Sequence, residues 1–165
     1  MIKLQGSSNE NFVVLGLGRS GMTSARALNS SGANVICWDD DPEKRSLASS
    51  QGLRVTGSVS DFDWESIDRL IISPGVPHHF PSPHPIVSAA VSAGVSIDND
   101  VGLFFQSIAT ETWDKFSVQP RIVAVTGSNG KSTTESLLHH IFLKLGYKSQ
   151  LAGNIGRSVL DIDPP

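Results

Sequence analysis

The chain has 165 residues, of which 39% are hydrophobic and 18% charged, and its formal net charge is −3. This length suits one domain, or one domain and part of another, and the composition is too apolar for a disordered chain. The small negative charge, with no long basic run, argues against a nucleic-acid or anionic-membrane partner.

The cysteine content and the apolar runs of the sequence indicate in which cellular compartment the protein is expected. Cys37 is the only cysteine in the sequence, so no intrachain disulfide can form and a reducing compartment fits best. Residues 1–12 lack the apolar core of a signal peptide, and no stretch approaches the ~20 apolar residues of a membrane-spanning helix. The sequence therefore predicts a soluble, cytoplasmic α/β protein.

Short apolar runs alternate with helix-compatible segments along the first hundred residues. Strands are expected at residues 11–16, 33–39, 68–75 and 95–97. Helices are expected from residue 19 to 31, from 42 to 51 and from 84 to 94, the last with one apolar face made of Ile86, Val87, Ala90 and Val91. This alternation predicts a Rossmann-like, doubly wound parallel sheet.

A second unit is expected after a break in this pattern. Residues 1–110 are assigned to the Rossmann-like domain, and the polar stretch 111–120 to a linker. Residues 121–165 are predicted to start a P-loop ATPase domain, with a strand over 121–127 and a helix over 131–146 whose apolar face holds Leu137, Leu138, Ile141, Phe142 and Leu145. One strand and one helix cannot enclose a core, so the chain is interpreted as a fragment whose second domain is truncated.

The first glycine-rich loop follows the first predicted strand. Gly16, Gly18 and Gly21 form the pattern G-x-G-x-x-G between a strand and a helix, which is typical of a pyrophosphate-binding turn. Asp39 ends the next strand, close to the ~20-residue spacing of a ribose-binding acid. The alternative is a tight turn with no ligand. The loop itself does not separate NAD, FAD and a UDP-sugar, which all present a pyrophosphate.

The second glycine-rich loop, TGSNGKST, lies at residues 126–133. Its backbone amides can point at phosphate oxygens, while Lys131 neutralises phosphate charge and the Ser132 hydroxyl binds Mg²⁺. The strict P-loop pattern would need glycine at Val125, so the match is incomplete. The alternative is an Asn-Gly turn followed by a polar helix start.

Four motifs together carry a family resemblance: VVLGLGRSG, LIISPGVP, VAVTGSNGKST and AGNIG. In order and spacing they resemble those of the Mur ligases of peptidoglycan synthesis, nearest to the branch that adds D-glutamate, over nearly the whole chain beyond the first ten residues. The resemblance implies that the first domain holds the UDP part of UDP-N-acetylmuramoyl-L-alanine. The implied binding residues are Gly18, Arg19, Ser20, Asp39, Ser73, Pro74, Gly75 and Asn154.

The same resemblance implies that ATP and Mg²⁺ bind at the second loop. The implied ATP-binding residues are Gly127, Ser128, Asn129, Gly130, Lys131, Ser132, Thr133 and Thr134, with Lys131 as the catalytic residue and Ser132 on the metal. In the implied reaction, ATP phosphorylates the L-alanine carboxylate, and the amine of D-glutamate attacks the acyl phosphate. D-glutamate would bind through a domain beyond residue 165, so the chain by itself is expected to be inactive. One departure is Gly102, where the family often has an acid.

Three other interpretations stay open. An NAD(P)-binding oxidoreductase or regulatory domain would use the first loop and Asp39, but would leave the second loop unexplained. A noncatalytic nucleotide-sensing module would bind ligands at both loops only to regulate a partner. Another Mur ligase that adds a different amino acid would share the second loop.

Overall fold

The computed structural model describes residue 4, residues 6–110 and residues 121–163, so the predicted linker at 111–120 lies outside the described residues. Its centre is a four-stranded sheet in the order β2-β1-β3-β4, and every pairing is parallel. The strands are β1 (Asn11–Leu15), β2 (Asn34–Trp38), β3 (Arg69–Ile72) and β4 (Ser96–Asp98). The predicted Rossmann-like parallel sheet is confirmed.

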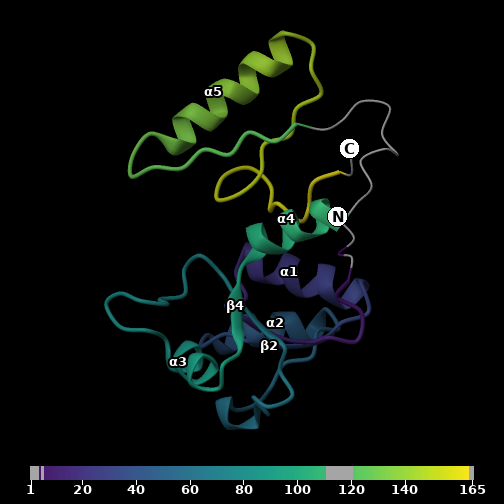
Figure 1. Cartoon of the computed structure of the whole chain (residues 1–165), viewed down its shortest axis with the longest axis vertical. Coiled ribbons are helices and arrows are strands. Elements are labelled where there is room, and N and C mark those ends of the chain that lie inside the picture. Colours follow the sequence, from purple (N-terminus) through teal and green to yellow (C-terminus); the bar gives the residue numbers. More distant parts are fainter. Residues whose placement is uncertain (1–3, 5, 111–120, 164–165) are drawn as a thin grey trace.

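The helices are α1 (Arg19–Ser30), α2 (Pro42–Ser50), the short 3₁₀ helix η1 (Val59–Asp61), α3 (Pro85–Ser92), α4 (Asp100–Thr110) and α5 (Lys131–Lys144) (Figure 1). The first four connect successive parallel strands, whereas α4 and α5 follow β4. Both α2 and α3 start with proline in the first turn, where the missing N–H costs nothing. The side chains of Asp41 and His84 cap these two helices by accepting backbone amides.

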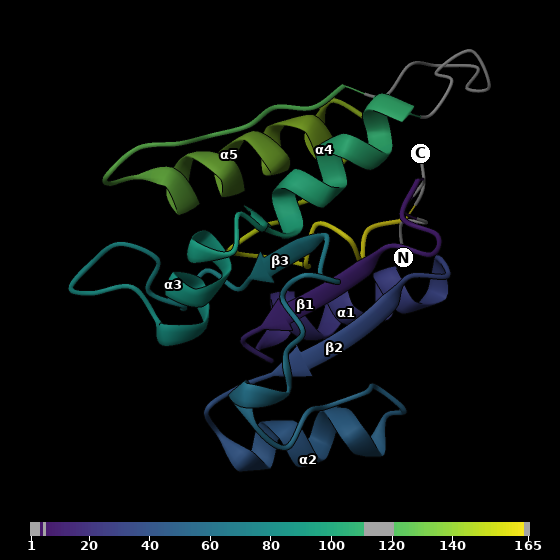
Figure 2. The same ribbon diagram turned by 60° about the horizontal axis from the view of Figure 1, so that its bottom comes forward.

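Apolar side chains cover both faces of the sheet, so the strands are buried on two sides. Figure 2 shows the helices arranged around the strands. On one face Val14 and its neighbours pack against α1, α4 and a C-terminal segment. On the other face Leu15 and its neighbours pack against α3 and the segment that contains Phe62. Alternation along β1 therefore sends successive residues into two different cores.

Helix α4 is an element that the sequence interpretation did not predict. Its start carries a recognisable signal, because the Asn99 side chain accepts the Gly102 amide at 2.9 Å. Its apolar spacing is equally clear: Leu103 and Phe104 are buried in the core cluster, and Ile108, four residues after Phe104, packs against it. The Asn99 cap also explains why the stretch around Gly102 is helical rather than part of a loop.

The predicted strand at residues 121–127 is wrong, since that segment has no strand structure and is almost entirely exposed. A parallel strand needs a neighbouring strand for its backbone hydrogen bonds, and no strand in the described part of the chain pairs with it. Residues 121–130 are irregular and lead into α5, so in the described part of the chain this region consists of a loop and a helix without a strand.

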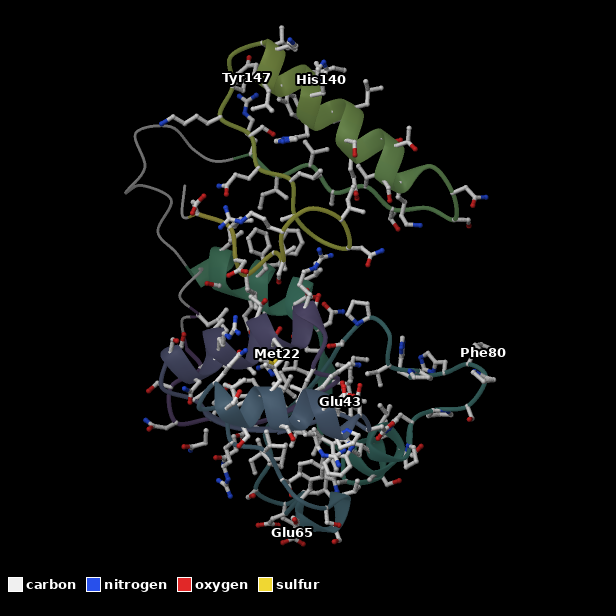
Figure 3. All side chains as sticks on the ribbon, turned by 180° about the vertical axis from the view of Figure 1, so that it is seen from behind. Met22, Glu43, Glu65, Phe80, His140 and Tyr147 are labelled. Atoms are coloured by element: carbon white, nitrogen blue, oxygen red, sulfur yellow. The ribbon has the colours of Figure 1, made fainter. Side chains whose placement is uncertain are left out.

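Helix α5 forms where it was predicted, but its apolar face is not buried. It lies at one end of the molecule's long axis, beyond α4 (Figure 1). Leu137 is 57% exposed, Leu145 67% and Tyr147, just after the helix, 65% (Figure 3). On α3, Val91 is 63% exposed, so its predicted place on the buried face is also wrong, whereas Ile86, Val87 and Ala90 are buried as expected.

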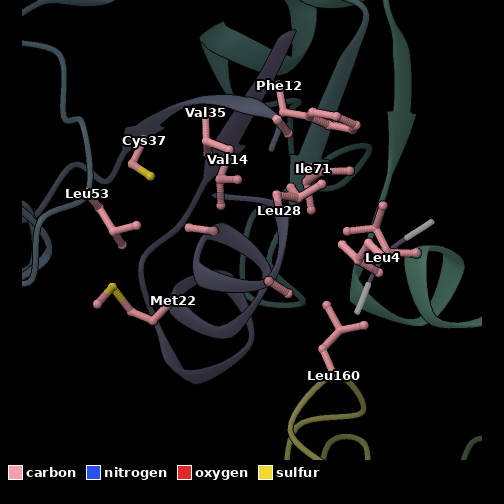
Figure 4. Close-up of a cluster of buried hydrophobic side chains, with 14 of the residues drawn as sticks. Leu4, Phe12, Val14, Met22, Leu28, Val35, Cys37, Leu53, Ile71 and Leu160 are labelled. Carbon is pink, nitrogen blue, oxygen red and sulfur yellow. The ribbon is translucent and has the colours of Figure 1, made fainter. Parts of the chain in front are cut away.

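The segment at residues 158–160 returns to the first unit and enters its core. Val159 is 7% exposed and Leu160 is fully buried, in the cluster that contains Leu28 of α1 and Leu103 of α4. Figure 4 shows Leu160 projecting into this cluster from the C-terminal segment. The core of the Rossmann-like unit therefore includes residues from beyond residue 121, the boundary expected for the second domain.

Candidate functional site

A cleft of about 410 Å³ opens at the carboxyl ends of the central strands. The chain leaves β1 for β2 on one side and later enters β3 on the other side, which makes this edge a topological switch point. Open α/β sheets bind ligands in such crevices. All eight residues expected to hold the UDP part line this one cleft: Gly18, Arg19, Ser20, Asp39, Ser73, Pro74, Gly75 and Asn154.

The first glycine loop is held tightly against β3. The Gly16 amide donates to the Trp38 carbonyl at 2.8 Å, and the Ser73 hydroxyl donates to the Gly16 carbonyl at 2.7 Å. Gly16 has a φ of +88°, which L side chains rarely adopt. At Gly21 a Cβ would lie 1.7 Å from the Gly16 carbonyl oxygen, so only glycine lets α1 approach β1 this closely. The Ser73 hydroxyl thus stabilises the conformation of the glycine loop.

The start of α1 presents unpaired donors to the cleft. Its N-cap is Gly18, which has no side chain to cap the first amides, and its first turn carries no acidic residue. Uncapped amides and the positive end of the helix dipole favour an anion at this point. A Cβ at Gly18 would meet no protein atom within 4 Å. The fold therefore does not require glycine at Gly18, in contrast to Gly21.

Replacement of Gly18 by alanine is expected to leave the melting temperature within about 2 °C of wild type, because the added methyl meets open space. Affinity for a UDP-nucleotide is expected to fall roughly tenfold or more, since the methyl occupies the space a pyrophosphate needs. Thermal unfolding and calorimetric titration of the two proteins check this. Unchanged affinity would show that no phosphate approaches Gly18.

Asp39 is buried and its carboxylate is already engaged. One oxygen accepts the Leu17 amide at 2.6 Å, and the other accepts the Asp41 amide at 2.9 Å. Lys44 lies 3.6 Å away and supplies the compensating charge. Asp39 therefore ties the glycine loop to the start of α2, in addition to its place in the cleft wall.

Asp40 and His84 form a second wall of the cleft that the sequence interpretation did not assign to the site. His84 Nε2 lies 3.0 Å from an Asp40 oxygen, and the other Asp40 oxygen accepts from Trp38 Nε1 at 3.1 Å. Because His84 Nδ1 accepts the Ile86 amide, Nε2 is the nitrogen that carries the proton toward Asp40. The position of His84 just before Pro85 was the available signal, since residues before a helix-starting proline serve as caps.

The hydrogen bond from Trp38, and then that from His84, lower the pKa of Asp40 below its ordinary 3.8. A lowered folded-state pKa gives stability that is present above pH 3.8 and is lost as the pH falls through the folded-state value. Asp40→Asn should therefore be less stable than wild type at about pH 5, with the difference shrinking as the pH falls below 3.8. Chemical unfolding of both proteins across this range checks the sign; a difference that grows toward low pH would contradict it.

The second glycine loop lies apart from this cleft, at the start of α5. Gly130 is its N-cap in the left-handed region, with a φ of +78°, and no side chain caps the helix. Lys131 folds back so that its ammonium donates to the carbonyls of Gly127 and Ser128. Residues 128–130 and 132–134 are exposed. The eight residues expected to bind ATP are contiguous here, with open amides at a helix start.

Clusters of metal-ligating side chains and long apolar helices are two further features that bear on function. Within residues 6–110 and 121–163 there is no group of three or more His, Cys, Asp or Glu side chains that could hold a metal ion. None of the helices described is long and apolar enough to cross a membrane. A cation at Ser132 would therefore depend on ligands beyond this side chain.

Comparisons with known proteins identify similar sequences along the whole chain. A UDP-N-acetylmuramoylalanine--D-glutamate ligase of Roseobacter denitrificans is 54% identical over 165 residues, which are 100% of this chain and 36% of that protein. The ligase of the same name from Cereibacter sphaeroides is 52% identical over 99% of this chain and 35% of its own length. The chain thus spans about a third of the length of these relatives.

A solved structure shares the fold. The UDP-N-acetylmuramate:L-alanyl-gamma-D-glutamyl-meso-diaminopimelate ligase from Neisseria meningitides aligns with 84% of this chain and 41% of its own, with a TM-score of 0.50 and 18% identity. Residues 10–99, which include β1 to β4 and the glycine loop, match the model of the Mur ligase MurD-like, N-terminal domain. The chain belongs to the MurD-like Mur ligases.

Proposed function

We propose that this chain supplies the UDP-substrate site and the ATP phosphate loop of a ligase that adds D-glutamate to UDP-N-acetylmuramoyl-L-alanine. The observation that carries the proposal is the convergence of eight residues, from three separate motifs and from Asp39, on one cleft at the switch point of the sheet. The relatives named above have this activity in their names and match the chain from end to end.

The cleft offers what a nucleoside diphosphate needs. Uncapped amides at the start of α1 face the place for the pyrophosphate, with Gly18 leaving room for close approach. The Lys44 ammonium and the Arg19 guanidinium add positive charge at the cleft wall. Trp38, stacked under the Arg45 guanidinium at 4.6 Å, lies beside Asp39 and Asp40. We place the uridine toward this end and the sugar toward Asn154.

The loop at residues 127–134 fits the phosphates of ATP. Its donors are uncapped amides at a helix start, and its one ammonium, on Lys131, now satisfies only neutral carbonyls of its own loop. An incoming phosphate can replace those carbonyls, because a charged acceptor binds an ammonium more strongly than a neutral one. Bound Mg²⁺ would neutralise phosphate charge there, with Ser132 as one ligand.

In the proposed ligation the chain's own residues bind and orient. The cleft holds the UDP part, so that the L-alanine carboxylate reaches the ATP loop, and Lys131 stabilises charge while the phosphoryl group moves to that carboxylate. The amine of D-glutamate then displaces phosphate from the acyl phosphate. We place the reaction in the cytoplasm, since the sequence has a single cysteine, Cys37, and so cannot form an intrachain disulfide.

Lys131→Ala is expected to lower the ATP-dependent turnover of the full-length ligase at least about 100-fold, because the phosphoryl group loses its main positive neighbour. Affinity for the UDP-substrate should stay within about twofold, since Lys131 lies outside the first cleft. Phosphate release and substrate titration measure the two effects. Lys148→Ala, which removes a lysine beyond the end of α5, is the matched control and should retain full turnover.

The function itself is tested by phosphate release from ATP in the full-length protein. We expect release only when UDP-N-acetylmuramoyl-L-alanine and D-glutamate are both present, with ligated product in equal amount. Equal release with another amino acid would move the protein to a different Mur ligase. Release that ignores both substrates, or none at all, would contradict the ligase and favour a nucleotide-sensing module.

A dinucleotide oxidoreductase is the second candidate, since Asp39 directly follows β2, where a ribose-binding acid would lie. In this structure both Asp39 oxygens already accept backbone amides, from Leu17 and Asp41. The carboxylate therefore has less capacity left for two ribose hydroxyls. The oxidoreductase would also leave the loop at residues 127–134 without a role. For these two reasons we favour the ligase over a dinucleotide-binding oxidoreductase.

A further inference from the structure

The Arg19 side chain makes a long-range contact that its place in the glycine loop does not explain. Its guanidinium donates from Nη2 to the Asn154 carbonyl at 2.8 Å and from Nη1 to the Gly156 carbonyl at 3.0 Å. These bonds join the start of α1 to residues more than 130 positions later in the chain. A planar guanidinium suits this task, because its fork of donors can hold two acceptors at once.

Arg19 contacts a short loop, residues 152–157. The two ends of this loop, its base, are hydrogen-bonded to each other, and its middle, the tip, is largely exposed. At the base the Gly153 amide donates to the Arg157 carbonyl at 2.8 Å, and the Arg157 amide donates to the Leu151 carbonyl at 3.2 Å. Beyond the base, Val159 and Leu160 are buried in the core. Asn154 at the tip is exposed and lines the cleft. Among the hydrogen bonds recorded for the described residues, the two from Arg19 alone tie this tip to the glycine loop.

We propose that Arg19 is a positioning residue that holds the segment 152–157 across the mouth of the cleft and so sets Asn154 against the bound UDP-substrate. This inference rests on the proposed function of the cleft and deepens it. Both Nη1 and Nη2 of Arg19 already donate to carbonyls of this segment, those of Gly156 and Asn154. Arg19 therefore acts on the substrate mainly through Asn154, rather than as a direct ligand of the pyrophosphate.

Amide hydrogen exchange tests, without any ligand, whether Arg19 holds residues 152–157 in place. In Arg19→Ala, the Gly153 and Arg157 amides are expected to exchange roughly tenfold faster, because the tip of the segment loses both of its ties. In Arg19→Lys the same two amides should exchange nearly as fast as in Arg19→Ala, since one ammonium cannot replace the two donor groups of the guanidinium. Arg26→Ala is the matched control on the same helix, because Arg26 binds Gln51 instead. Exchange at Gly153 and Arg157 that is unchanged in Arg19→Ala would overturn the proposal.

A double-mutant cycle tests whether Arg19 acts through Asn154. We expect Arg19→Ala and Asn154→Ala each to weaken binding of UDP-N-acetylmuramoyl-L-alanine several-fold, and the double variant to be no weaker than the poorer single variant within about twofold. Loss factors that multiply in the double variant would show that Arg19 binds the ligand directly and would overturn the proposal. If wild type bound no UDP-substrate, the proposed function would fail. The exchange experiment would still show whether Arg19 holds residues 152–157 in place.

Discussion

Replacement of Gly21 by alanine is expected to destabilise the chain by at least about 3 kcal/mol, the upper end of the usual cost of overpacking. A Cβ at Gly21 would lie 1.7 Å from the Gly16 carbonyl oxygen and 2.7 Å from the Ser73 hydroxyl oxygen. The first of these is a backbone atom in a loop fixed on both sides, so it cannot move aside as a flexible side chain could. The helix would have to shift away from β1, which opens the core along Leu28 and Val14.

Thermal unfolding measures this effect. At roughly 2–4 °C per kcal/mol for a chain of this size, Gly21→Ala should melt at least about 6 °C below wild type. Gly18→Ala is the matched control, in the same loop but with open space around the added methyl. Equal melting temperatures for the two variants would contradict the close packing of α1 on the glycine loop.

Leu160→Ala is expected to cost about 2–5 kcal/mol, the range measured for fully buried leucines. Leu160 is completely buried in the cluster that joins α1 and α4, although it comes from the segment predicted to start a second domain. Truncation would leave a cavity beneath these helices. It would also release the anchor of residues 152–157, so we expect weaker substrate binding as well.

The control for Leu160 comes from the same stretch of chain. Leu145 follows α5 and is 67% exposed, so Leu145→Ala should change stability by less than about 0.5 kcal/mol. Chemical unfolding of both variants decides the matter. If Leu160→Ala were as stable as Leu145→Ala, the C-terminal segment would not be part of the first unit's core.

The parallel sheet and its helices could be predicted because their signals are local. An apolar β-branched run that ends in glycine marked β1, a second apolar run marked β2, and proline marked the starts of α2 and α3. Helix α4 is not predicted, even though Asn99 and the spacing of Phe104 and Ile108 carry the same kinds of signal. A strand was predicted at residues 121–127 from its apolar sequence, but strands need partners, and sequence alone does not show whether these are present.

The residues of the site followed from motifs, whereas their interactions did not. The G-x-G-x-x-G, Ser-Pro-Gly and Asn154 positions were expected to share one ligand, and the structure places them in one cleft. Three contacts depend on tertiary geometry that no spacing reveals. These are the Asp39 bond to the Leu17 amide, the pairing of Asp40 with His84 and the reach of Arg19 to residues 154 and 156.

The central claim is that the first cleft holds a UDP-substrate rather than a dinucleotide. Calorimetric titration of the 165-residue chain with UDP-N-acetylmuramoyl-L-alanine and, separately, with NADH tests it most directly. We expect the UDP-substrate to bind at least about tenfold more tightly than NADH, with that preference reduced in Gly18→Ala. Tighter binding of NADH, lost in the same variant, would contradict the account and identify the cleft as a dinucleotide site.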